Sequence, residues 1–176
     1  MPNAPAKRST RSRLAEELGK SGDFESPEQE AFLNLIRTHE ALSEPFERLF
    51  REHGISMPLY NILRILRGHA RASGGKGSYG TDVCGLPVQR IGSQMLTREP
   101  DMTRLVDRLE RAGLVCRHRC PQDRRVVLVE ITQAGIKLLD ALDKPVRKLH
   151  RDQLSHMHAD RIALLSELLG EARNAP

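Results

Sequence analysis

The segment from residue 26 to residue 52 carries an apolar repeat that is too long for a helix buried inside one small domain. Ser26, Pro27 and Gln29 provide a cap, a first-turn proline and a capping box at its start, and Pro45 is expected to kink it. Apolar side chains recur at helical spacing over about five turns, at Ala31, Phe32, Leu35, Ile36, Leu42, Phe46, Leu49 and Phe50. This pattern favours packing against another chain.

The region from residue 55 to residue 132 predicts three shorter helices followed by a β-hairpin. The helices correspond to "SMPLYNILRILRG", "LPVQRIGSQML" and "TREPDMTRLVDRLERAG", with Pro100 near the first position of the third. "LVCRHRC" and "VVLVEI" alternate like strands around the turn "PQDRR". Thr132 can cap a long helix that contains Pro145, and "DRIALLSELLGEAR" predicts a last one. The expected fold class is mainly α with a small β-hairpin wing.

Composition agrees with a helical protein that has an anionic partner. Aromatic residues make up 3% of the 176 residues and tryptophan is absent, which favours helices packed by Leu, Ile and Val. The formal net charge of +5 favours an anionic partner, although proteins that bind nothing anionic also carry an excess of this size. The sequence shows no signal peptide and no membrane-spanning stretch, so we expect a cytoplasmic protein, and an odd count of three cysteines favours reduced thiols.

Three short helices followed by a hairpin are the arrangement of a winged helix-turn-helix, whose third helix enters a major groove while the wing reaches along the backbone or into the minor groove. In the third helix, Thr103, Arg104 and Arg108 fall off the apolar stripe and present donors suited to phosphates and guanine edges. The alternative is that these charges only solvate the helix. At the hairpin turn, Arg124 and Arg125 have no use in packing, and Asp123 can hold one guanidinium in place.

The blocks "TRLVDRLERAGLV" (103 to 115) and "DRRVVLVEITQAG" (123 to 135) resemble the MarR family of bacterial transcriptional regulators, and the resemblance extends over residues 59 to 142. It implies a homodimer, interlocked by its first and last helices, that reads a palindromic operator in double-stranded DNA. It further implies that Arg125 enters the minor groove and that Asp123 orients it. We expect the neighbouring Arg124 to contact phosphate. Thr132 and Gly135 match the family's turn into the fifth helix.

The resemblance also implies a repressor released by a small aromatic or acidic inducer, with His39 and Tyr60 as expected ligand contacts. Two features depart from the family pattern. Glu99 and Asp101 place carboxylates where many members have hydroxyl residues. Three roles are open for these carboxylates: stabilising the positive N-terminal end of the helix, accepting a hydrogen bond from a cytosine amino group, or discouraging non-specific DNA binding. The glycine-rich loop from Ser73 to Gly80 is longer than usual.

The motif "CRHRC" suggests a rival hypothesis, a thiol- or metal-responsive sensor using Cys116, His118 and Cys120, or Cys84 in the loop. Residues four apart on a strand lie roughly 13 Å from each other, too far to share one zinc ion. We therefore predict no metal site, no cofactor and, because no catalytic motif is present, no enzyme activity. A third hypothesis is a winged domain that contacts protein only.

The expected organisation has three regions. Residues 1–25 form a basic and largely disordered arm, which either contacts DNA or remains a solvated tail. Residues 26–52 and 133–176 form a helical dimerisation region, and residues 55–132 form the winged helix-turn-helix domain.

Overall fold

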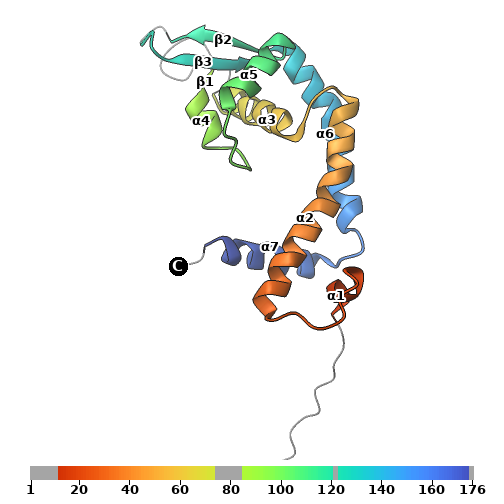
Figure 1. Ribbon diagram of the computed structural model, residues 1–176. Coiled ribbons are helices and arrows are strands. Elements are labelled where there is room, and N and C mark those ends of the chain that lie inside the picture. The colour runs from red at the N-terminus through yellow and green to blue at the C-terminus, as the bar shows by residue number, and fades with distance from the viewer. Residues whose placement is uncertain (1–11, 74–84, 121–122, 175–176) are drawn as a thin grey trace, which may run out of the picture. The chain divides into compact units, whose positions relative to one another are not determined.

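The computed structural model describes residues 12–73, 85–120 and 123–174, and it divides the chain into two compact units, Met1–Glu44 and Pro45–Pro176. The helices are α1 (Arg13–Glu17), α2 (Pro27–Glu52), α3 (Met57–Ala72), α4 (Val88–Gly92), α5 (Met102–Arg111), α6 (Gln133–Leu154) and α7 (Ala159–Arg173). The strands are β1 (Leu86–Pro87), β2 (Val115–Arg119) and β3 (Val127–Ile131). The predicted fold class, mainly helical with a small β wing, is confirmed (Figure 1).

The start of α2 is fixed by the predicted capping residues. The Gln29 backbone amide donates to the Ser26 hydroxyl at 3.2 Å, and the Gln29 side chain accepts from the Glu25 amide at 2.9 Å. The helix continues past Pro45 and ends before Gly54, whose φ of 73° is the left-handed conformation that glycine adopts without steric cost. At the N-terminal side, Ser12 caps α1, so part of the expected disordered arm is helical.

The wing is a three-stranded antiparallel sheet in the order β1-β3-β2. The predicted hairpin pairs β2 with β3, from Val115 opposite Ile131 to Arg119 opposite Val127. Strand β1 was not predicted, because its two residues lie immediately before α4 and read as the beginning of that helix. In Figure 1 the β2–β3 hairpin lies over α5 and projects beyond it.

A single apolar core holds α3, α5, α6 and the sheet together in the second unit. The most buried side chains come from these elements and from α2 and α4: Phe50, Ile62, Leu63, Leu66, Ile91, Val106, Leu109, Leu128, Val129, Leu139 and Leu142. The Phe50 and Tyr60 rings stack with centroids 4.4 Å apart. Helix α5 and strand β3 therefore share one packed core. The described residues contain no helix both long and apolar enough to cross a bilayer.

Two helix boundaries differ from the sequence prediction. Helix α3 continues four residues beyond Gly68, because that glycine is in ordinary helical backbone and nothing forces a stop there. Helix α5 begins after Pro100 and Asp101, since the Asp101 carboxylate accepts from the Arg104 amide at 3.0 Å and acts as the N-cap. Its predicted end is confirmed, because Gly113 has a φ of 69°.

The turn from β3 into α6 depends on Thr132 and Gly135. The Thr132 hydroxyl donates to the Gly113 carbonyl at 2.7 Å and accepts from the Gly135 amide at 3.2 Å. An added Cβ at Gly135 would overlap the Leu114 carbonyl oxygen and lie 2.7 Å from Ile131 Cγ1. The first turn of α6 thus requires glycine at position 135, where its backbone closely approaches the Leu114 carbonyl.

We predict that Gly135→Ala lowers the free energy of unfolding by about 1–3 kcal/mol, because backbone and a buried isoleucine must move apart to admit the methyl group. Urea unfolding followed by helical circular dichroism measures the change. Gly68→Ala serves as the matched control, since a Cβ there meets nothing within 4 Å, and it is expected to leave stability unchanged or slightly raised. Equal effects from both substitutions would contradict the steric explanation.

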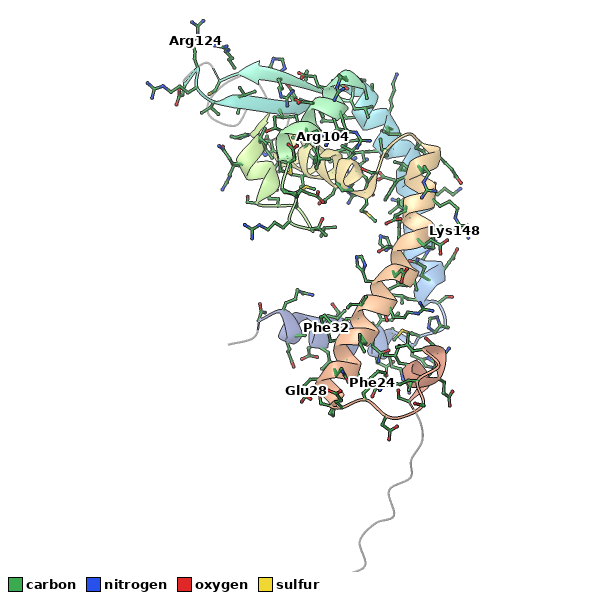
Figure 2. The ribbon with its side chains drawn as sticks, viewed as in Figure 1. Phe24, Glu28, Phe32, Arg104, Arg124 and Lys148 are labelled. Atoms are coloured by element: carbon green, nitrogen blue, oxygen red, sulfur yellow. The ribbon has the colours of Figure 1, made fainter. Side chains whose placement is uncertain are left out.

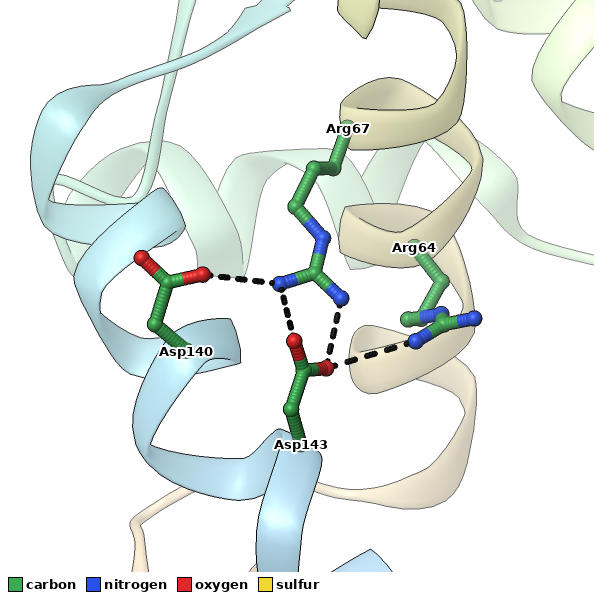
Figure 3. A network of polar contacts seen from close by, with 4 residues as sticks. All are labelled: Arg64, Arg67, Asp140 and Asp143. Carbon is green, nitrogen blue, oxygen red and sulfur yellow. Dashed lines mark hydrogen bonds and ion pairs between the residues drawn. The ribbon is translucent and has the colours of Figure 1, made fainter. Parts of the chain in front are cut away.

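An ion-pair network joins α3 to α6 (Figure 3). Arg67 is only 4% exposed, and its guanidinium donates to both carboxylate oxygens of Asp143, at 3.0 and 2.6 Å. It also donates to Asp140 at 3.1 Å, while Arg64 reaches Asp143 at 3.4 Å. The hydrogen bond from Arg67 lowers the pKa of the Asp143 carboxyl group. This network fixes α3 against α6.

Candidate functional site

Helix α5 presents the predicted donors to solvent. Val106 and Leu109 are buried on one side, whereas Thr103, Arg104 and Arg108 are exposed. Arg104 is labelled in Figure 2, on the helix beneath the hairpin. An amphipathic helix with one packed side and one row of donors is suited to lie in a groove of DNA.

The two carboxylates at the start of α5 have local partners. Asp101 caps the helix, as described above, and Glu99 accepts from the Thr97 hydroxyl at 3.0 Å. Of the three alternatives raised by the sequence, the contacts favour stabilisation of the positive helix end for Asp101. These local hydrogen bonds account for the positions of both carboxylates without any contact to a DNA base.

The hairpin tip places its arginines at an exposed turn. The Val126 amide donates to the Asp123 carbonyl at 2.9 Å, and the Cys120 amide donates to the Val126 carbonyl at 2.9 Å. Both Arg124 and Arg125 are exposed, and Figure 2 shows Arg124 extending away from the strands. The tip therefore offers positive charge at the part of the wing furthest from the core.

The contact of Asp123 with Arg125 differs from the sequence prediction. The carboxylate was expected to bind the guanidinium, but its Oδ1 accepts from the Arg125 backbone amide at 2.9 Å. An aspartate that bonds the amide two residues ahead forms an Asx-turn. Asp123 thus orients Arg125 by fixing the backbone that carries it.

Arg117 links the wing to α5, and the sequence analysis missed it. From β2 its guanidinium reaches Asp107 at 2.6 Å and Glu110 at 2.5 Å, and it donates to the Thr103 carbonyl at 3.4 Å. A sequence signal was present, because Arg117 alternates with Cys116 and His118 and so must face the helix side of the sheet. Its bonds fix the angle between the wing and the exposed donors of α5.

A cavity of about 620 Å³ lies between α3 and α6. It is lined by Tyr60, Asn61, Arg64, Ile65, Arg67, Arg71, Leu96, Asp143, Val146, Arg147 and His150. Burial raises the pKa of the Tyr60 hydroxyl, so it stays a neutral donor and acceptor. The lining combines apolar surface with several arginines, a combination that suits a small anionic molecule with an apolar body.

Only one of the two predicted ligand contacts lies at this cavity. Tyr60 is part of the lining, whereas His39 belongs to the first unit, where its ring lies 3.5 Å from the Ser43 hydroxyl. The arginines of the lining were not anticipated, because they come from two helices about 80 residues apart in sequence and only the fold brings them together.

The "CRHRC" stretch has a geometry that the sequence analysis did not foresee. Cys120 is buried, but Cys116 Sγ lies 3.1 Å from His118 Nε2, and that nitrogen lies 3.4 Å from Glu130 Oε2. Burial, and then the charges of Glu130 and Glu110, raise the pKa of the Cys116 thiol. Cys84, the other predicted thiol, lies outside the described residues.

Comparison with known proteins places this arrangement in a family. The MarR family model matches residues 84–127. The crystal structure of a MarR transcription factor from Planctomyces limnophilus is 39% identical, covering 84% of this chain and 98% of that chain with a TM-score of 0.59. The chain belongs to the MarR family. Members of this family are DNA-binding transcriptional regulators and not enzymes.

Two further relatives cover most of the MarR-family chain. The HTH-type transcriptional regulator MhqR of Bacillus subtilis (strain 168) is 25% identical over 138 residues, which are 78% of this chain and 86% of MhqR. The crystal structure of NadR in complex with 4-hydroxyphenylacetate is 26% identical, covering 82% of this chain and 92% of that chain, with a TM-score of 0.58. The similarity thus extends well beyond the wing and α5.

Proposed function

We propose that this transcriptional regulator is a homodimeric repressor that binds a palindromic operator and is released by a small aromatic acid. The observation that carries the proposal is the coupling of two cationic surfaces through Arg117: the exposed donors of α5 and the arginines at the wing tip. With their relative orientation fixed, Thr103, Arg104 and Arg108 read the major groove while Arg124 and Arg125 contact the adjacent backbone and minor groove.

Dimerisation is supported by apolar surface on the flanking helices. On α2, Phe32, Leu35 and Ile36 are 61%, 43% and 51% exposed, and on α7, Leu164 and Leu168 are 53% and 51% exposed. Large apolar side chains at helical spacing are stabilised when a partner covers them. Residues 26–52 and 133–176 therefore serve as the dimerisation region, covered by a second copy of this chain, and residues 55–132 serve as the DNA-binding domain.

Two-fold symmetry of the protein requires two-fold symmetry of the operator, with half-site centres separated by about one turn of DNA, roughly 10 base pairs. Selection of bound genomic fragments by the purified protein tests the proposal. Recovery of palindromic fragments, whose binding weakens steeply with salt, supports it. Failure to retain any DNA at low salt would instead favour a winged domain that contacts protein.

The inducer class follows from the cavity between α3 and α6. Arg71 and Arg147 are exposed cations in its lining, and Arg67 already binds Asp140 and Asp143. An aromatic carboxylate places its ring against Ile65 and Val146 and its carboxylate beside Arg71 or Arg147. This ligand class is supported by NadR, a similar protein whose crystal structure contains the aromatic carboxylate 4-hydroxyphenylacetate.

We predict that 4-hydroxyphenylacetate binds and that Arg147→Gln weakens its binding about 10-fold, as expected for one charge-assisted hydrogen bond of about 1.5 kcal/mol. Isothermal titration measures both affinities. The neutral 4-hydroxyphenylacetamide should bind the native protein and Arg147→Gln equally. The control variant Arg51→Gln removes the same charge from α2, outside the cavity lining. If native protein and Arg147→Gln bound 4-hydroxyphenylacetate with equal affinity, a contact between Arg147 and the ligand carboxylate would be contradicted.

A further inference from the structure

The outer face of the wing gathers three side chains with metal-binding chemistry. Residues on a strand alternate between faces, and Arg117 faces α5, so Cys116 and His118 face the opposite side of the sheet. Glu130 stands directly opposite Cys116 in the register of the β2–β3 hairpin and points to that same outer face. The cluster thus comes from two strands whose relative position is fixed by the ladder.

The donor atoms of this cluster are close enough to share one ion. Cys116 Sγ, His118 Nε2 and the Glu130 carboxylate all lie within 4.8 Å of one another. Cys116 Sγ lies 3.1 Å from His118 Nε2, and that nitrogen lies 3.4 Å from Glu130 Oε2. Tetrahedral zinc with ordinary bond lengths requires about 3.6 Å and about 3.4 Å for these two pairs. Moving one side chain by about half an ångström lengthens the sulfur–nitrogen separation to the value that zinc requires.

We propose that Cys116, His118 and Glu130 form a zinc site that joins the two strands of the wing. One thiolate, one imidazole and one carboxylate are the three kinds of zinc ligand found in proteins, and a solvent molecule completes the tetrahedron on the side where the His118 side chain is 42% exposed. On coordination the Cys116 thiol releases its proton to solvent, and both electrons of the new bond come from sulfur.

The site differs from the metal hypothesis that the sequence suggested. That hypothesis drew its third ligand from Cys120, which lies just beyond the end of β2 and is buried. Glu130 supplies the third ligand instead, from the neighbouring strand. Because its ligands lie on both strands, the ion fixes the outer side of the hairpin that carries Arg124 and Arg125, whereas Arg117 fixes the inner side.

The site is tested by titrating the reduced, metal-stripped full-length protein with Co²⁺, which substitutes for zinc. The expected result is one equivalent bound per chain, with the near-ultraviolet charge-transfer band of a cobalt–thiolate bond and the visible bands of tetrahedral cobalt, all abolished by added Zn²⁺. Cys116→Ser should remove the charge-transfer band. His118→Gln and Glu130→Gln should each weaken Co²⁺ binding at least 10-fold.

The matched controls are the other two thiols. Cys84→Ser and Cys120→Ala should retain the band with unchanged affinity, and helical circular dichroism of every variant confirms that it is folded. Absence of a thiolate band in the native protein, or a band that survives in Cys116→Ser, would overturn the assignment. A band that is lost in Cys84→Ser would overturn it as well, because the thiolate would then come from the loop.

Discussion

Arg125→Ala is expected to reduce operator affinity by about 10- to 100-fold, in the range of one lost base-edge or groove contact of about 1–3 kcal/mol. The arginine is exposed at the turn, and its backbone amide is held by Asp123, so removing the side chain disturbs no packing. The fold and the proposed dimer should therefore remain intact. Fluorescence anisotropy with a selected operator, at one fixed salt concentration, measures the loss.

The matched comparison is with Arg124 and Lys137. Arg124→Ala should weaken binding to operator and to unrelated DNA alike and reduce the salt slope by about one, as expected for a phosphate contact. Lys137→Ala removes the same charge from an exposed position of α6 and should leave affinity almost unchanged. If Arg125→Ala bound the operator as tightly as the native protein, the wing would have no part in DNA reading.

The second large effect concerns the network between α3 and α6. Asp143→Ala leaves Arg67 buried, with Asp140 as its remaining carboxylate partner in the network of Figure 3. Asp140 is a weak replacement, because its side chain is 56% exposed. Removing one partner of a buried ion pair typically costs about 3–5 kcal/mol. Since Asp143 is itself 22% exposed, we expect a loss of about 3 kcal/mol in the free energy of unfolding, near the lower end of that range.

Urea unfolding near neutral pH measures this loss, and Arg64→Ala is the control. The Arg64 side chain is 50% exposed and its pair with Asp143 should contribute less than about 1 kcal/mol. The double variant Arg67→Met with Asp143→Leu should recover much of the stability lost in Asp143→Ala, because no charge then remains buried. A double variant as unstable as Asp143→Ala would show that the loss comes from packing rather than from the uncompensated charge.

The same pair gives stability a defined dependence on pH. Arg67 holds the pKa of Asp143 below its ordinary value, so the folded state favours the charged carboxylate. The contribution is therefore complete above the unfolded-state pKa of about 4. It is lost as the pH falls from there through the lower folded-state pKa. The difference in stability between native protein and Asp143→Ala should shrink over that acidic window.

Local sequence patterns predicted the wing, the donor row of α5 and the turn at Thr132, because each depends on residues close in sequence. Strand alternation puts Arg117 and Cys116 on opposite faces of β2, but the side chains that they contact lie on other elements and cannot be read from this strand alone. Glu130 lies opposite Cys116 only through the β2–β3 register, and Arg67 meets Asp143 only through the packing of α3 on α6. Sequence periodicity describes each element separately, whereas these sites are made between elements.

The bonds of Arg117 also limit how specificity can be re-engineered in this protein. A designer who exchanges α5 alone for the helix of another regulator would replace Asp107 and Glu110 and so leave the Arg117 guanidinium in β2 without its two carboxylate partners. The exchangeable module is therefore larger than α5 alone. It must include residue 117, so that α5 and the wing are inherited together.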